Sequence, residues 1–196
     1  KVAGKIEAIK NLMNKVAKLL IGGGMAFTFL KAWGYSVGTS LVEESHLNIA
    51  LEIIESAKRS GIKLYLPVDC VITNKFDFQA KKLPKDAEVK IVPIKEIPDG
   101  WFGLDIGPAT IMLFKEALSD AKTIIWNGPI GVFEAEPFSR GTYAMVTALS
   151  SSYALTIVGG GDTDVAIHKA GETANISYIS TGGGAFIELL EGKVLP

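Results

Sequence analysis

The chain has 196 residues, 48% of them hydrophobic, which is enough to bury the core of one domain or one large lobe. Lysine and arginine together number 20 and aspartate and glutamate 21, so the formal net charge of −1 favours neither nucleic acid nor a membrane surface. The single cysteine, Cys70, excludes an internal disulfide and agrees with a reducing cytosol, and the longest nearly apolar stretch, 19–30, is too short to span a bilayer. We therefore predict a cytoplasmic protein that binds neither nucleic acid nor membrane.

Apolar spacing, together with the positions of glycine and proline, predicts the elements in chain order. The predicted helices cover 5–18, 25–32, 43–60, a segment that begins near 107–108, 136–151, 162–170 and 183–190, and the predicted strands cover 19–21, 63–69, 103–105, 123–126, 155–158 and 176–180. Between about 74 and 100, three prolines stand among alternating charges, which indicates short antiparallel pieces such as Glu88–Val92. The pattern predicts an α/β fold: a Rossmann-like parallel β-sheet with helices on both faces, plus a small antiparallel excursion around residues 74–100.

Three glycine triplets, Gly22–Gly24, Gly159–Gly161 and Gly182–Gly184, each follow a predicted strand and precede a predicted helix. Bare backbone allows a tight turn, and it lets phosphate groups approach the unpaired N–H groups of a helix N-terminus. In parallel sheets ligands bind beyond the carboxyl ends of the strands. One triplet is explained by a turn alone. Three triplets, each at the turn between a strand and the following helix (a glycine corner), indicate a polyphosphate site.

The familiar nucleotide motifs do not fit these corners. The dinucleotide-binding turn needs Gly or Ala at its last position, where the three triplets have Phe27, Asp164 and Ile187. No Walker A sequence is present. A nicotinamide-dependent oxidoreductase and a P-loop enzyme are therefore both disfavoured.

Asp162 follows the second triplet directly and has two interpretations. An aspartate at a helix start is often an N-cap. Beside a phosphate cradle, however, its charge would repel phosphate unless a cation intervened, and Mg²⁺ held by a carboxylate and phosphate oxygens resolves the conflict. We expect Asp162 to bind Mg²⁺, with capping in the free protein as a further role.

The segment Trp126–Glu134 and the start of the chain supply further candidates. Asn127 is suited to donate to a phosphate and Glu134 to accept from ribose hydroxyls, although a Pro/Gly loop with a solvated glutamate is the plainer interpretation. Lys1 and Lys5 stand at a helix N-terminus, where cations oppose the macrodipole, so a bound anion explains them better than helix stability does. Simple surface solvation is the alternative.

Six ordered blocks of this sequence resemble phosphoglycerate kinase, specifically its carboxy-terminal, nucleotide-binding domain. The blocks are Lys1–Ile6, Gly22–Leu30, Leu66–Asp69, Trp126–Glu134, Gly159–Thr163 and Ser180–Ala185. The resemblance covers essentially the whole chain. It implies reversible phosphoryl transfer from 1,3-bisphosphoglycerate to MgADP, giving 3-phosphoglycerate and MgATP in glycolysis.

The resemblance also implies a role for each matching residue. Lys1 would neutralise charge on the phosphoryl group during its transfer, and Lys5 would hold nucleotide phosphates. Asp162 would be associated with Mg²⁺, and Thr163 would contact phosphate. Backbone N–H groups of Gly161, Gly183 and Gly184 would face the transferred group, and Gly160 would adjoin the phosphates. The adenine slot would be formed by Gly23, Gly24, Leu41, Phe102, Gly103, Leu104 and Val132, and the nucleotide would also contact Asn127, Pro129, Gly131 and Glu134.

The sequence departs from the family in one large respect: it contains no block that matches the arginine- and histidine-rich phosphoglycerate patch of the amino-terminal domain. We therefore expect 1–196 to be the nucleotide-binding domain of a two-domain kinase, incomplete at both ends, from a full-length monomer. It would bind MgADP or MgATP without turnover and meet phosphoglycerate only through the amino-terminal domain. The alternative is a stand-alone, non-catalytic nucleotide-binding module.

Overall fold

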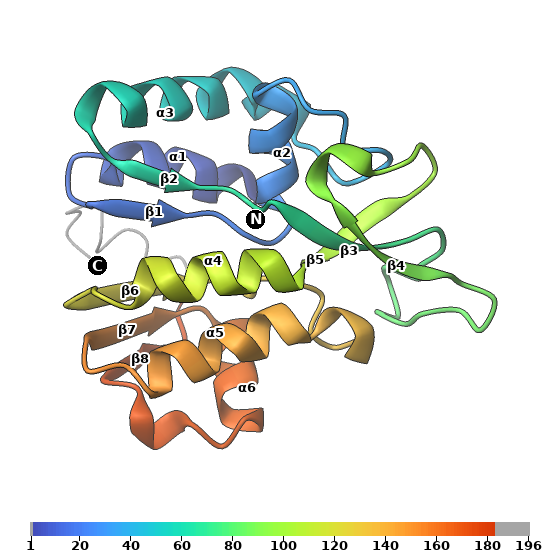
Figure 1. Ribbon diagram of the computed structural model, residues 1–196. Coiled ribbons are helices and arrows are strands. Elements are labelled where there is room, and N and C mark those ends of the chain that lie inside the picture. The colour runs from blue at the N-terminus through green and yellow to red at the C-terminus, as the bar shows by residue number, and fades with distance from the viewer. Residues whose placement is uncertain (1, 183–196) are drawn as a thin grey trace.

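The computed structural model describes residues 2–182, with side chains from Lys5 onward (Figure 1). Its α-helices are α1 (Val2–Leu12), α2 (Met25–Ala32), α3 (Leu47–Ser60), α4 (Pro108–Leu118), α5 (Arg140–Ser150) and α6 (Gly161–Lys169). Its strands are β1 (Lys18–Leu20), β2 (Lys63–Tyr65), β3 (Asp69–Thr73), β4 (Val89–Pro93), β5 (Phe102–Ile106), β6 (Thr123–Asn127), β7 (Leu155–Gly159) and β8 (Tyr178–Ser180). Within 2–182 no helix combines the length and the apolar character needed to cross a bilayer.

Parallel pairing dominates the two ends of the chain and antiparallel pairing the middle. β1 pairs with β2 in parallel, and β7 lies between β6 and β8, again in parallel. β3 lies between β4 and β5, antiparallel to both, and in Figure 1 this sheet projects to one side of the molecule. The predicted α/β class and the antiparallel excursion are both confirmed, although the parallel strands form two sheets here.

Helices cover both faces of β1 and β2, as alternate residues along each strand show. Leu19 of β1 and Leu64 of β2 pack on a core cluster that α1, α2 and α3 help to build. Their neighbours Leu20 and Tyr65 pack on a second cluster, with residues from α4, α5 and α6. Because successive strand side chains point to opposite faces, the three early helices and the three later ones lie on opposite sides of β1 and β2.

α3 shows how the sequence sets a helix. Its buried residues Ala50, Ile53, Ile54 and Ala57 recur at three- and four-residue intervals and form one apolar face. The helix ends at Gly61, whose φ of +71° is in the left-handed region, and whose N–H donates to the carbonyl of Ala57. The predicted end of this helix at residue 60 is confirmed.

The predicted ends of the 5–18 helix and of the 63–69 strand are wrong. The first helix was expected to reach residue 18 but ends at Leu12, because Lys18 is already extended and pairs with Lys63. The strand expected over 63–69 stops at Tyr65, and a separate strand begins at Asp69. Pro67, which has no N–H to donate, lies in the gap where the chain passes from a parallel to an antiparallel sheet.

The helix predicted from residue 43 begins at Leu47, after a 3-10 turn at Glu44–His46, and most other elements match within one or two residues. The strand predicted at 103–105 exists as β5, but it pairs antiparallel with β3 instead of joining a parallel sheet. The helix expected over 136–151 divides into a 3-10 turn, Glu136–Phe138, and α5. The helix predicted over 183–190 lies outside the described residues.

Candidate active site

A cavity of about 280 Å³ lies where α1, the end of β1, β5 and the loop after β6 meet. It collects ten of the residues predicted to bind the nucleotide: Lys5, Gly23, Gly24, Leu41, Phe102, Gly103, Leu104, Pro129, Gly131 and Val132. Its walls are largely apolar, and Leu41, with 66% of its surface exposed, stands at the rim. An apolar slot with a cationic side chain at one end is the expected shape for a site that binds a base and its phosphates.

Glycine at position 103 is required by the packing of this slot. A Cβ at residue 103 would overlap the aromatic ring of Phe27, which is buried and lines the same cavity. The strand backbone and the Phe27 ring therefore lie in direct contact, and together they form one wall of the slot.

A smaller, more polar space of about 130 Å³ adjoins the first triplet, and Lys5, Gly23, Gly24 and Pro129 line both cavities. Asn127, the last residue of β6, also lines this second space. The amide nitrogen of Asn127 is buried and has no hydrogen-bond partner among the described residues. Because an unpaired buried donor is costly, an acceptor atom that reached Asn127 would be bound favourably.

Direct contacts join the glycine corners to the loop after β6. A Cβ on Gly22 would stand 3.0 Å from the side chain of Ile130, and one on Gly23 would stand 3.0 Å from the carbonyl of Pro129. At the second corner, the N–H of Gly128 donates to the hydroxyl of Thr163 over 3.0 Å. The first and second triplets therefore both contact this one loop.

The second and third corners adjoin one another. Gly160 has a φ of +101°, which favours glycine, and its N–H donates to the carbonyl of Ser180 over 2.9 Å. Gly161 opens α6 beside the carbonyl of Thr181. Of the third triplet only Gly182 is described, so the predicted roles of Gly183 and Gly184, like that of Lys1, fall outside the described residues.

The electrostatics of the site centre on Lys5 and Asp162. Burial lowers the pKa of the Lys5 amine, while the charge of Asp162 raises it in part. The amine has no hydrogen-bond or ion-pair partner among the described residues, and it lies over Gly128, whose φ is +88°. A partly buried, unpaired ammonium group is stabilised by an anionic ligand.

The structure removes the capping interpretation of Asp162. α6 begins at Gly161, with Gly160 in the N-cap position, and no side chain caps the helix. Asp162 therefore lies within the first turn of α6, where its negative charge interacts favourably with the helix dipole. Its carboxylate has no hydrogen bond within residues 2–182, and these residues hold no group of three acidic, histidine or cysteine side chains that could bind a metal alone.

Glu134 lies at the surface, as the plainer interpretation expects, but its carboxylate is held in an ion pair. Its Oε1 accepts a hydrogen bond of 2.9 Å from the amine of Lys81, and only 28% of its side chain is exposed. Lys81 lies in the irregular segment between β3 and β4, so the ion pair connects that segment to the loop after β6.

Sequence patterns missed several residues of the cavity. Phe78 lines it beside Phe102, with ring centroids 5.3 Å apart, but it lies in a segment without periodicity. Asp105 also lines it and is 3% exposed, although it reads as one polar residue in an apolar strand. Cys70 lines the cavity as well, and burial raises the pKa of its thiol to about 12, so it is an unreactive core residue.

A separate apolar cavity of about 410 Å³ lies between α2, β2 and α4 and includes Trp33, Tyr35 and Leu113. Among the described residues that line it there is none of those predicted to contact the nucleotide, and no glycine of the three triplets. Most of the predicted nucleotide-binding residues therefore line the cavity of about 280 Å³ and the space beside it, and not this separate cavity.

The fold and the site together define the class of protein. It is a Rossmann-like α/β protein in which a partly buried lysine, an unpaired amide and the first glycine triplet line two adjoining cavities at the ends of parallel strands. Residues 1–193 match the family model for phosphoglycerate kinase. The chain belongs to the phosphoglycerate kinase family.

Individual relatives support this assignment. The chain is 65% identical over all its 196 residues to the phosphoglycerate kinase of Geotalea uraniireducens and 63% identical to that of Citrifermentans bemidjiense. It covers 47% of each of these proteins, about half their length. The solved phosphoglycerate kinase structure from Coxiella burnetii is 44% identical, with a TM-score of 0.91 over 99% of this chain and 49% of that one.

Proposed function

We propose that this chain is the nucleotide-binding lobe of a phosphoglycerate kinase, in which MgADP accepts the phosphoryl group of 1,3-bisphosphoglycerate and MgATP and 3-phosphoglycerate are formed reversibly. The observation that carries the proposal is the buried, unpaired amide nitrogen of Asn127 beside the Gly160 corner. A phosphate oxygen supplies the acceptor that this amide lacks. The same corner supplies backbone N–H groups at the start of α6.

The residues of the site fit a magnesium nucleotide. The apolar slot around Phe27 and Gly103 suits a planar base, and Lys5 suits the phosphates. Asp162 would hold Mg²⁺ as a single carboxylate and leave the other positions to phosphate oxygens and water, as Mg²⁺ commonly requires. The metal would neutralise charge on the phosphates when bound.

The reaction does not need a protein side chain to form a covalent bond with the transferred group. Phosphoryl transfer depends on positioning, charge neutralisation and exclusion of water, so no nucleophile or general base is needed when the acceptor is already a phosphate or carboxylate oxygen. Lys5 opposes the charge of the phosphates, and the helix N-terminus at Gly161 directs N–H groups toward them. The apolar wall formed by Phe27, Phe78 and Phe102 keeps water from the base.

Calorimetric titration with ADP tests this proposal. We expect saturable binding that is tighter with Mg²⁺, and we expect Asp162→Asn to abolish the effect of the metal. Asp164→Asn is the matched control, because Asp164 is the other acidic residue in the first turn of α6. If the two variants changed the effect of Mg²⁺ on ADP affinity equally, the assigned role of Asp162 would be contradicted. The same would follow if the wild type bound ADP equally well with and without Mg²⁺.

We further propose that the chain alone binds nucleotide without turnover. Arg59 and Arg140 are its only arginines, and neither lines the cavity, so the described site has no cluster suited to clamp a phosphoglycerate. A coupled assay with 1,3-bisphosphoglycerate and MgADP should give no ATP above background. Turnover by the purified chain would contradict this part of the proposal, whereas a non-catalytic nucleotide-binding module would also give none.

A further inference from the structure

The segment between β3 and β4 folds back toward the candidate active site and is held there by aromatic packing. The ring of Phe76 contacts that of Phe138 at a centroid distance of 5.7 Å, and the ring of Phe78 contacts that of Phe102 at 5.3 Å. Phe76 and Leu83 also pack on the core cluster that contains Leu104, Ala135 and Phe138. The segment between β3 and β4 and the loop after β6 therefore pack on the same hydrophobic cluster.

Residues 77–82 form a closed turn at the tip of this segment. The backbone groups of Asp77 and Lys82 exchange two hydrogen bonds, of 3.0 and 3.2 Å. Inside the turn, Oδ1 of Asp77 accepts from the N–H groups of Gln79 and Ala80. The backbone on either side of Lys81 is consequently fixed.

Lys81 occupies this turn in an unfavourable backbone conformation. Its φ is +54°, and it is the only residue other than glycine with a positive φ among residues 2–182. A lysine is disfavoured in this region, and such strain is retained where the surrounding structure requires it. The conformation coincides with the ion pair in which the Lys81 amine lies 2.9 Å from Oε1 of Glu134.

The backbone at Glu134 is also fixed. Its neighbours Phe133 and Ala135 are buried, and the N–H of Ala135 donates to the carbonyl of Val132, a residue that lines the cavity. Lys81 engages only Oε1, and Oε2 has no hydrogen bond among the described residues. The hydrogen bond to Glu134 and the charge of that carboxylate raise the pKa of Lys81, and the charge of Asp162 adds to the effect.

We propose that Lys81 is a positioning residue that holds the Glu134 carboxylate through Oε1, so that Oε2 remains oriented to accept from the ribose hydroxyls of the nucleotide. The inference rests on the proposed function, because it assumes that a nucleotide fills the cavity. Two partners that are both fixed on one core lose little entropy when they pair, so this bond orients Glu134 better than an ordinary surface pair would.

Calorimetry with two nucleotides separates this role from simple attraction of phosphate. We expect Lys81→Met to weaken MgADP binding about fivefold, the effect of one misoriented hydrogen bond, and to leave the binding of magnesium 2′,3′-dideoxy-ADP unchanged. Lys81→Arg should restore most of the difference between the two nucleotides. Lys82→Met, which removes the neighbouring exposed lysine, should change neither affinity.

The outcomes distinguish this inference from the proposed function. If Lys81→Met weakens both nucleotides equally, or neither, Lys81 does not act through Glu134 and the inference is wrong while the nucleotide site stands. If the wild-type chain binds neither nucleotide, the proposed function fails and the inference fails with it. Thermal melting of each variant shows that the fold is retained.

Discussion

Asp105 is a buried carboxylate at the edge of the candidate site. Its oxygens accept from the N–H groups of Ile106 and Gly141, each over 2.9 Å, and only 3% of the residue is exposed. Burial raises the pKa of Asp105 to about 7, although these two hydrogen bonds and the charge of Arg140 act in the opposite direction. At a pH between its ordinary pKa of 3.8 and about 7, Asp105 therefore keeps a proton in the folded protein that it has released in the unfolded chain.

This proton makes stability depend on pH. Between the pKa of the unfolded chain and about 7, the folded state binds more protons, so the free energy of unfolding falls as pH rises and levels off above that value. From pH 5.5 to 8 the loss from Asp105 alone is about 2 kcal/mol. Urea unfolding at these two pH values should show this loss in the wild type and a smaller one in Asp105→Asn.

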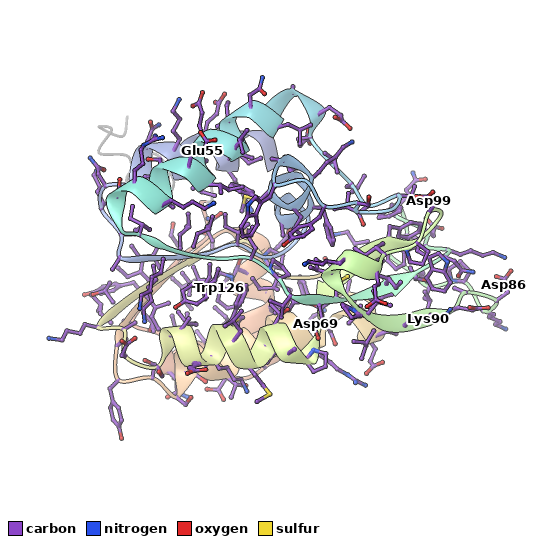
Figure 2. The ribbon with its side chains drawn as sticks, turned by 45° about the horizontal axis from the view of Figure 1, so that its top comes forward. Glu55, Asp69, Asp86, Lys90, Asp99 and Trp126 are labelled. Carbon is purple, nitrogen blue, oxygen red and sulfur yellow. The ribbon has the colours of Figure 1, made fainter. Side chains whose placement is uncertain are left out.

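Asp99→Asn, on an exposed turn, is the control for this comparison (Figure 2). It should keep the wild-type pH dependence. Equal pH dependence in Asp105→Asn and the wild type would mean that the carboxylate of Asp105 does not titrate in this range.

Single residues also show where sequence patterns are informative. Asn127 and Asp162 could be chosen as candidates from the sequence, because in each case a polar side chain follows a strand at a glycine corner. Asp105 and Lys81 could not be selected in this way. Their roles depend on Gly141 and Glu134, which lie far away in the sequence and come close only through the tertiary fold.

At the scale of the element, α4 depends on one side chain from outside the helix. The carboxylate of Asp69, in β3, accepts from the N–H groups of Ala109 and Thr110 and from the hydroxyl of Thr110. Figure 2 shows Asp69 beside the first turn of this helix. Asp69 thereby supplies the N-terminal cap that Gly107, the residue in the N-cap position, has no side chain to provide.

Removal of this cap should destabilise the protein. We expect Asp69→Ala to lower the free energy of unfolding by about 2 kcal/mol, because it leaves buried N–H groups without an acceptor. Asp86→Ala, which removes an exposed ion pair with Lys75, should leave the urea midpoint nearly unchanged. Equal shifts in the two variants would show that Asp69 does not stabilise α4.

The elements that were predicted well are those in which a single pattern decides. The α3 helix has both an apolar face and Gly61, so its type and its end could be predicted. The 63–69 segment could not be predicted correctly, because its apolar residues continue through Pro67 while the chain changes sheets. Pairing partners decide that outcome, and a single segment contains no information about them.

At the scale of the whole molecule, topology assembles the site. Parallel strands direct their carboxyl ends to the same edge, so glycine corners far apart in sequence come together even though β1 and β6 belong to different sheets. This convergence could be predicted from alternating strands and helices. The fold of the β3–β4 segment over the cavity could not, since it depends on contacts between Phe76, Phe78 and distant rings.

The separate apolar cavity between α2, β2 and α4 allows a direct test of where a nucleotide binds. Amide chemical shifts of the isotopically labelled chain, recorded during titration with MgADP, report binding at each residue. We expect saturable shifts concentrated at Gly23, Gly128, Gly131 and Gly160, around the glycine corners. Shifts concentrated instead at Trp33 and the rest of the cavity between α2, β2 and α4, or no saturable shifts, would contradict a nucleotide site at the carboxyl ends of the parallel strands.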